Sequence, residues 1–143
     1  MAGPAQFADQ ESRIAAILEI PLHRFLGLRL GDPQDLTAGL LLDVTGPTLN
    51  QARLLHGGIV SALLDVAAFL ALVPSLSAGE HAVTHEISVQ LLRPVPEGAQ
   101  VCFRGEVLRA GRQVVFLRAE GRVDGRIAAS AQVTKSRVTG PDR

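Results

Sequence analysis

Hydrophobic and polar residues change their spacing along this chain, and the changes divide it into predicted elements. Apolar residues recur at helical intervals over residues 9–20, which predicts a short amphipathic helix that Asp9 caps and that ends before Pro21. Beyond it, apolar and other residues alternate, and this two-residue period predicts strands. The first two predicted strands cover residues 25–30 and 38–44, and residues 46–55, which have no clean period, form a predicted loop.

The longest apolar run lies in the middle of the chain and predicts a helix over residues 57–73 that Pro74 stops. Only Ser61 and Asp65 are polar within it, so the helix is apolar nearly all round. The run is slightly short of the ~20 residues that cross a bilayer. It also carries a carboxylate in its middle, which lipid disfavours. We therefore interpret it as a helix buried in protein and expect no membrane association.

After this helix the two-residue period returns and predicts four more strands. They cover residues 83–91, 101–107, 115–123 and 127–133, with turns at 110–112 and at Asp124-Gly125. The tail after residue 138 is expected to fray. Six antiparallel strands and one long helix fit a single α+β domain, residues 1–143, in which a curved sheet wraps the helix.

Composition removes several classes of function. The chain has 143 residues, of which 47% are hydrophobic, enough for a packed core. Its 14 basic and 14 acidic side chains balance, so it lacks the basic excess of a general nucleic-acid binder. A single cysteine, Cys102, excludes an intrachain disulfide and a cysteine-rich zinc site. No secretory signal is recognisable near Met1, and we expect a cytoplasmic protein.

Candidate chemistry gathers around the central helix. A carboxylate on a buried helix needs a partner or a task, so Asp65 either accepts structural hydrogen bonds or acts as a general base or nucleophile. His56-Gly57-Gly58 stands where the helix begins, six residues after Asn50. Glycines there leave backbone N–H groups uncovered at the positive end of the helix dipole, as an oxyanion site requires. The alternative is that they only permit a tight turn.

Helix geometry separates the two groups. Gly57 and Asp65 are eight residues apart, which places them ~12 Å apart along the axis and about 80° apart around it. One helix cannot direct both at the same carbonyl. If they act together, the carboxylate comes from a second copy of the chain, which predicts a two-fold dimer with sites at its interface.

These residues resemble the hotdog-fold acyl-CoA thioesterases of the PaaI type, over roughly residues 26–134. The resemblance rests on Asn50, His56-Gly57-Gly58, Asp65, Thr84-x-Glu86 and Leu92-Arg93-Pro94. It implies a hotdog fold and the hydrolysis of an acyl-CoA thioester to free acid and CoA. It implies no metal and no cofactor beyond the CoA of the substrate. It also implies a homodimer with shared sites, which in such proteins often pairs further into a tetramer.

The resemblance also assigns roles to individual residues. The backbone N–H of Gly57 would polarise the thioester carbonyl, and Asp65 of the other subunit would activate water or attack directly. Asn50 and His56 would position the thioester or the water, and Thr84 would orient the attacking group.

The CoA part of the substrate would lie across the dimer surface. Gly58 and three basic side chains near the phosphates are the candidate substrate-binding residues: Arg93, Arg109 and Arg112. The resemblance does not identify the acyl group of the substrate.

His85 departs from the pattern. It is expected to share a face with Val83, Ile87 and Val89, where similar proteins carry an aliphatic residue. It is either a hydrogen-bonded residue at the core edge or a group that tunes the substrate.

Two other functions use the same features. A hydroxyacyl-thioester dehydratase would pair His56 with Asp65, although the Gly-Gly motif with Asn50 is closer to the hydrolases. A non-catalytic acyl-CoA sensor is the alternative from another class, although such proteins often lose the helix carboxylate.

Overall fold

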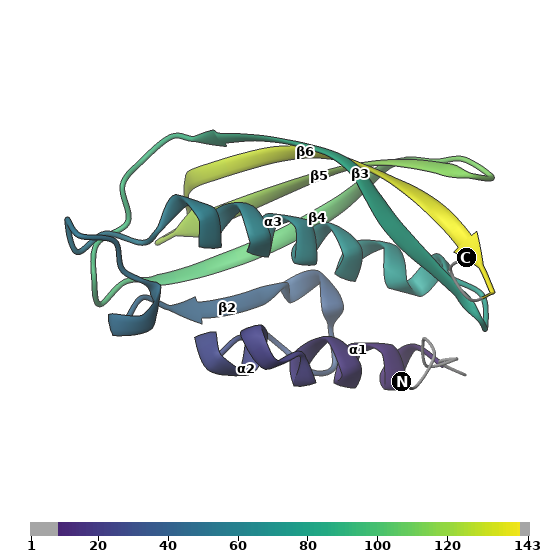
Figure 1. The fold of residues 1–143 in the computed structure, drawn as a ribbon, viewed down its shortest axis with the longest axis horizontal. Coiled ribbons are helices and arrows are strands. Elements are labelled where there is room, and N and C mark those ends of the chain that lie inside the picture. Colours follow the sequence, from purple (N-terminus) through teal and green to yellow (C-terminus); the bar gives the residue numbers. More distant parts are fainter. Residues whose placement is uncertain (1–8, 141–143) are drawn as a thin grey trace.

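The computed structural model describes residues 9–140, which form one antiparallel sheet and its helices (Figure 1). In chain order the elements are α1 (Gln10–Glu19), α2 (Pro21–Leu26), β1 (Arg29–Leu30), η1 (Leu36–Ala38), β2 (Leu40–Asp43), η2 (Gly46–Thr48), α3 (Gly57–Leu72), η3 (Val73–Ser75), β3 (Glu80–Leu91), β4 (Gln100–Ala110), β5 (Val114–Val123) and β6 (Arg126–Thr139).

The sheet has six strands in the order β1-β2-β4-β5-β6-β3, and every neighbouring pair is antiparallel. It curves along α3, which lies against its concave face (Figure 1). Leu63 and Leu64 of the helix and Phe103 of β4 are fully buried between the two layers. The predicted α+β arrangement, with one long central helix and a short N-terminal helix, is therefore confirmed.

The N-terminal helix begins as its sequence predicts. The Asp9 carboxylate accepts a hydrogen bond from the backbone N–H of Ser12 at 2.7 Å, which satisfies one of the unpaired donors of the first turn. This backbone bond, with a second one from the Ser12 hydroxyl, holds the pKa of Asp9 below its ordinary value.

The predicted strand over residues 25–30 is wrong in its first half. Pro21 does not simply end the first helix: it occupies the first turn of a second one, where its missing N–H costs nothing. Gly27, at φ +72°, ends α2 in the left-handed conformation, and the chain then pairs over Arg29–Leu30 alone. Leu26 and Leu28 are both buried, so their alternation reflects burial on either side of a helix end.

The central helix is covered less completely than its composition predicts. Ser61, Asp65 and Phe69 lie one turn apart and are only partly buried, so α3 presents a stripe that is partly open. The sheet packs on one side of the helix, and along this stripe the cover within residues 9–140 is only partial. By length and composition Gly57–Ser75 could cross a membrane, but most of its large side chains pack in the core.

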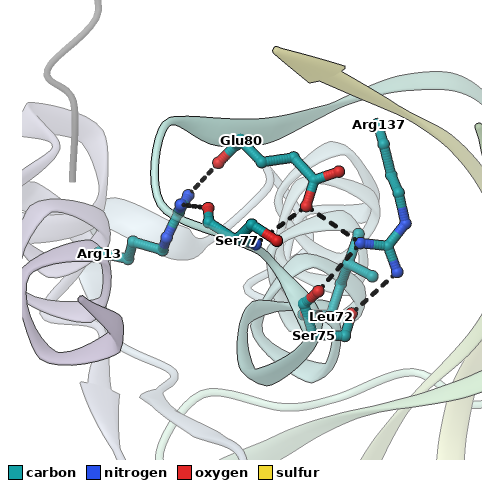
Figure 2. A network of polar contacts seen from close by, with 6 residues as sticks. All are labelled: Arg13, Leu72, Ser75, Ser77, Glu80 and Arg137. Carbon is teal, nitrogen blue, oxygen red and sulfur yellow. Dashed lines mark hydrogen bonds and ion pairs between the residues drawn. The ribbon is translucent and has the colours of Figure 1, made fainter. Parts of the chain in front are cut away.

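A polar network fixes the far end of α3 (Figure 2). Arg13 of α1 donates to the carbonyl oxygens of Glu80 and, at 2.5 Å, of Ser77. Arg137 of β6 pairs with the Glu80 carboxylate at 3.2 Å and donates to the Ser75 carbonyl at 3.0 Å. The network joins α1, η3 and β6 to the start of β3. β3 and β6 remain paired as far as Glu80 and Thr139, so pairing continues one residue into the expected tail.

Candidate functional site

The start of α3 leaves one backbone donor free. His56 caps the helix: its Nδ1 accepts from the Gly58 N–H at 3.0 Å, and its carbonyl accepts from Ile59 and Val60. The Gly57 N–H has no acceptor among residues 9–140. It therefore stands alone at the positive end of a 16-residue helix, where an oxygen with developing negative charge is stabilised.

The two glycines have different tasks. A Cβ on Gly58 would lie 3.1 Å from the His56 ring, so Gly58 makes room for the capping imidazole. A Cβ on Gly57 would lie 2.9 Å from Cδ1 of Leu91, so its absence keeps the approach to the free amide open. The Gly58 N–H is used inside the protein, since it donates to the His56 ring, and the role of Gly58 in substrate binding stays a prediction.

Asn50 organises the loop before the helix. Its Oδ1 accepts from the backbone N–H groups of Ala52 at 2.9 Å and Leu54 at 3.1 Å, while its own N–H donates to the Leu54 carbonyl. Because the side-chain oxygen is occupied in this way, the Nδ2 donor is the part of Asn50 left for a ligand.

Asn50 and Gly57 line the same cavity. It has a volume of about 230 Å³ and runs between the start of α3 and the sheet. Most of its wall is apolar, with Val60, Leu91, Val101, Phe103, Ala128 and Ala129 among its lining residues. Arg93, two residues beyond the end of β3, also lines it. An apolar group can thus be buried beside two hydrogen-bond donors.

Three arginines surround a second, more open cavity that shares Leu92 and Arg93 with the first: Arg93, Arg122 and Arg126. Arg122 is held by Glu120 and by the Gly125 carbonyl. Arg93 and Arg126 have no ion pair within the described chain. Sequence reasoning missed Arg122 and Arg126, although both flank the predicted Asp124-Gly125 turn, whose hairpin brings them to one strand end.

The other two predicted arginines lie elsewhere. Arg109 stands near the end of β4 and Arg112 in the turn to β5. Arg122, which lines the second cavity, lies opposite Cys102 in the strand register, at the start of β4. Within one chain, these two arginines therefore lie at the opposite end of the sheet from the cavity beside Gly57.

Asp65 belongs to a compact polar cluster in the middle of α3. Its Oδ1 accepts from the Thr84 hydroxyl at 2.8 Å and from the Lys135 ammonium at 2.8 Å. Lys135 Nζ also lies 2.6 Å from Thr84 Oγ1. The Asp65 side chain is 36% exposed and that of Lys135 only 3%. The carboxylate is therefore more exposed than its place on a helix predicted to be buried would suggest. No hydrogen bond within residues 9–140 reaches its Oδ2.

A β-bulge turns Thr84 toward this cluster. Thr84 pairs with Lys135 and Glu86 with Thr134, so His85 is an extra residue in β3. Across the bulge the strand face that is turned toward α3 passes from Thr84, which is itself exposed, to Ile87. This corrects the expectation that His85 shares the face of Ile87 and Val89. His85 is exposed, and its Nε2 contacts the Ser136 hydroxyl.

Lys135 is a site residue that the sequence analysis missed. It stands 70 positions from Asp65, so no local spacing links them. Composition held a signal, however: it is the only lysine in a chain whose other basic side chains, histidines aside, are arginines.

The predicted residues thus form two groups on one chain. Asn50, His56 and Gly57 lie at the start of α3, and Asp65 and Thr84 lie about two turns further along. Within residues 9–140, no three His, Cys, Asp or Glu side chains converge on a metal site, and the absence of a metal and of a cofactor stays a prediction.

Comparison with known proteins identifies the fold. A family model described as the thioesterase superfamily matches residues 53–134. A thioesterase family protein from Silicibacter pomeroyi is 28% identical, with a TM-score of 0.79 over 92% of this chain and 98% of its own. The E. coli PaaI protein of the phenylacetic acid degradation operon is 22% identical (TM-score 0.78; 92% and 96% covered). A Bacillus halodurans protein solved with CoA is 18% identical (TM-score 0.76; 89% and 82% covered). Curated proteins gave no match.

Proposed function

Because the chain belongs to the thioesterase superfamily and has the hotdog fold of PaaI-like thioesterases, we propose that it hydrolyses acyl-CoA thioesters to a free acid and CoA. One observation carries the proposal: a single helix holds a free amide beside an apolar cavity at its start and a partly exposed carboxylate two turns later. These are the parts that thioester hydrolysis requires, an oxyanion donor and a base or nucleophile.

The carbonyl end of the substrate lies at the start of α3 in this proposal. The thioester oxygen accepts from the Gly57 N–H, which becomes a stronger contact as negative charge develops on that oxygen. The Nδ2 of Asn50 holds the thioester or the attacking water beside it. The apolar wall of the cavity takes the acyl group, and the Nε2–H of His56 is the part of that side chain left to donate, because Nδ1 accepts from Gly58.

The carboxylate that completes the site comes from a second chain. The regular helix keeps Gly57 and Asp65 ~12 Å apart along its axis, so one chain cannot bring both to one carbonyl. β3 is an edge strand of twelve residues, and an unpaired edge of that length is a template for another strand. Pairing two copies there would also bring the open stripes of their α3 helices together.

In this proposal the nucleotide part of CoA lies against Arg93 and Arg126. Both lie around the open cavity that adjoins the acyl cavity, and neither is neutralised by an acidic side chain in the described chain. Guanidinium groups bind phosphate with two parallel hydrogen bonds. The CoA-bound neighbour supports CoA as the carrier of the acyl group.

Thiol release tests the proposed reaction. We expect the protein to liberate CoA from at least one of a short, a medium, a long and an aryl acyl-CoA, with a thiol reagent as the detector. Binding of these esters without any thiol release would contradict hydrolysis and favour the acyl-CoA sensor.

We expect a dimer in solution, and sedimentation should find no stable active monomer.

Complementation tests whether the two chains of the dimer share each site. Equal amounts of Gly57→Val and Asp65→Asn chains, each inactive alone, should recover about a quarter of wild-type turnover when refolded together, because half of the dimers then hold one intact site. A mixture that stays inactive although mixed dimers form would show that each site lies within one chain.

A further inference from the structure

The Lys135 ammonium is enclosed by three groups. It donates to Asp65 Oδ1 at 2.8 Å and to Thr84 Oγ1 at 2.6 Å, and it lies 5.6 Å from the centre of the Phe69 ring. Asp65 and Phe69 are one turn apart on α3, whereas Thr84 and Lys135 face each other across β3 and β6. The ammonium therefore connects the helix to the sheet at the carboxylate.

This placement is expensive for a purely structural contact. Removing an ammonium from water has a large cost in free energy, and a well-packed apolar pair of similar volume is often as stable. Every other strongly basic side chain here is arginine, yet this position holds lysine. An ammonium is a compact donor with three protons and fits between a hydroxyl, a carboxylate and a ring where a planar guanidinium would not.

We propose that Lys135 is the positioning residue of the reactive carboxylate, an inference that rests on the proposed function. It fixes Asp65 by one oxygen, Oδ1, and so presents the other, Oδ2, on the open side of the helix. Oδ2 is then the atom that takes the proton of water or attacks the thioester.

Thr84 completes the same arrangement. Its single hydroxyl proton is committed to Asp65 Oδ1, and one of its lone pairs accepts from Lys135. In this state Thr84 bridges the ammonium and the carboxylate, and it has no proton left to orient an attacking group. The bulge at His85 serves the site because it turns Thr84 toward Asp65.

Lys135→Met tests the inference, because methionine keeps the length of the side chain and removes the charge and all three donors. A misplaced catalytic group costs about 10²-fold, so we expect kcat to fall by about that factor while KM stays unchanged. Phe69→Leu is the matched control: it removes the ring beside the ammonium but leaves both hydrogen bonds, and kcat should stay near the wild-type value.

The Asp65→Asn background separates positioning from general damage. If Lys135 acts through Asp65, adding Lys135→Met to Asp65→Asn should lower kcat no further. A second measurement needs no activity. Because the chain has one lysine, ¹⁵N-lysine labelling gives one side-chain ammonium signal. It should be protected from exchange in the wild-type protein and should shift in Asp65→Asn.

The outcomes are distinct. Four results would each overturn the positioning role. The first two are a wild-type kcat in Lys135→Met and, in the Asp65→Asn background, a further loss of kcat as large as the one that Lys135→Met causes alone. The other two are an equally large loss in Phe69→Leu and an ammonium signal that does not change in Asp65→Asn. These results would leave the proposed hydrolysis standing. Full turnover by Asp65→Asn would instead overturn the proposed site and the positioning role together.

Discussion

Asp65→Asn should lower kcat for acyl-CoA hydrolysis by about 10²–10⁴-fold, the range by which general-base catalysis accelerates reactions. Asparagine keeps the size of the side chain, and its oxygen can still accept from Thr84 and Lys135 at the Oδ1 position. Its nitrogen, at the position of Oδ2, can neither take a proton from water nor attack a carbonyl. Steady-state thiol release with the best substrate measures the loss.

The same variant should be somewhat less stable. Lys135 is buried and loses its counter-charge, but Asp65 is 36% exposed, so the free energy of unfolding should fall on the order of only 1 kcal/mol. Asp32→Asn is the matched control, since it neutralises an exposed turn carboxylate that accepts from the Gln34 N–H. Near-full turnover by Asp65→Asn would remove the carboxylate from the mechanism.

Gly57→Val should lower kcat by about 10²–10³-fold, the cost of losing one oxyanion donor. The new Cβ lies 2.9 Å from Cδ1 of Leu91, and the branched side chain stands where the thioester approaches the free amide. Leu91 is 58% exposed and can move aside, so the melting temperature should change little. Thiol release and a thermal melt of the same preparation measure both effects.

Gly57→Val combined with Leu91→Ala distinguishes two causes of this loss. Leu91→Ala restores the space, so recovery of kcat would trace the defect to crowding, whereas a persistent loss would trace it to the shielded amide. A folded, dimeric Gly57→Val protein with unchanged hydrolysis would eliminate the oxyanion role. An unfolded one would mean that the glycine serves the turn alone.

Periodicity predicts the parts of this fold that bury one continuous face. The central helix and the last four strands have long apolar patterns. The structure places the helix and three of these strands within three residues of the prediction, whereas β6 runs six residues beyond its predicted end at residue 133. The segment around α2 fails because it is short. Six residues from Pro21 to Leu26 form too few turns to show a helical period, and two buried leucines on either side of Gly27 imitate a strand.

The residues of the candidate site also differ in how far local sequence patterns predict them. Asn50, His56 and Gly57 act through local geometry at a helix start, which spacing along the chain can reveal. The surroundings of Asp65 depend on a register shift in β3 and on a lysine in the last strand. A single inserted residue reverses which side chains face the helix, and a pattern of alternation carries no sign of the strand that lies opposite.

The contact between α3 and β4 has a mechanical consequence for the two halves of the site. At Gly105 the strand approaches the helix so closely that a Cβ would lie 2.2 Å from the Ala67 carbonyl oxygen. Backbone meets backbone there, and the contact is a natural pivot for any tilt of the helix. Asp65 lies about 3 Å from this pivot along the axis and Gly57 about 15 Å. A tilt of the helix about this contact therefore displaces the backbone at Gly57 about five times as far as the backbone at Asp65. The carboxylate then stays nearly in place, whereas the position of the Gly57 amide changes.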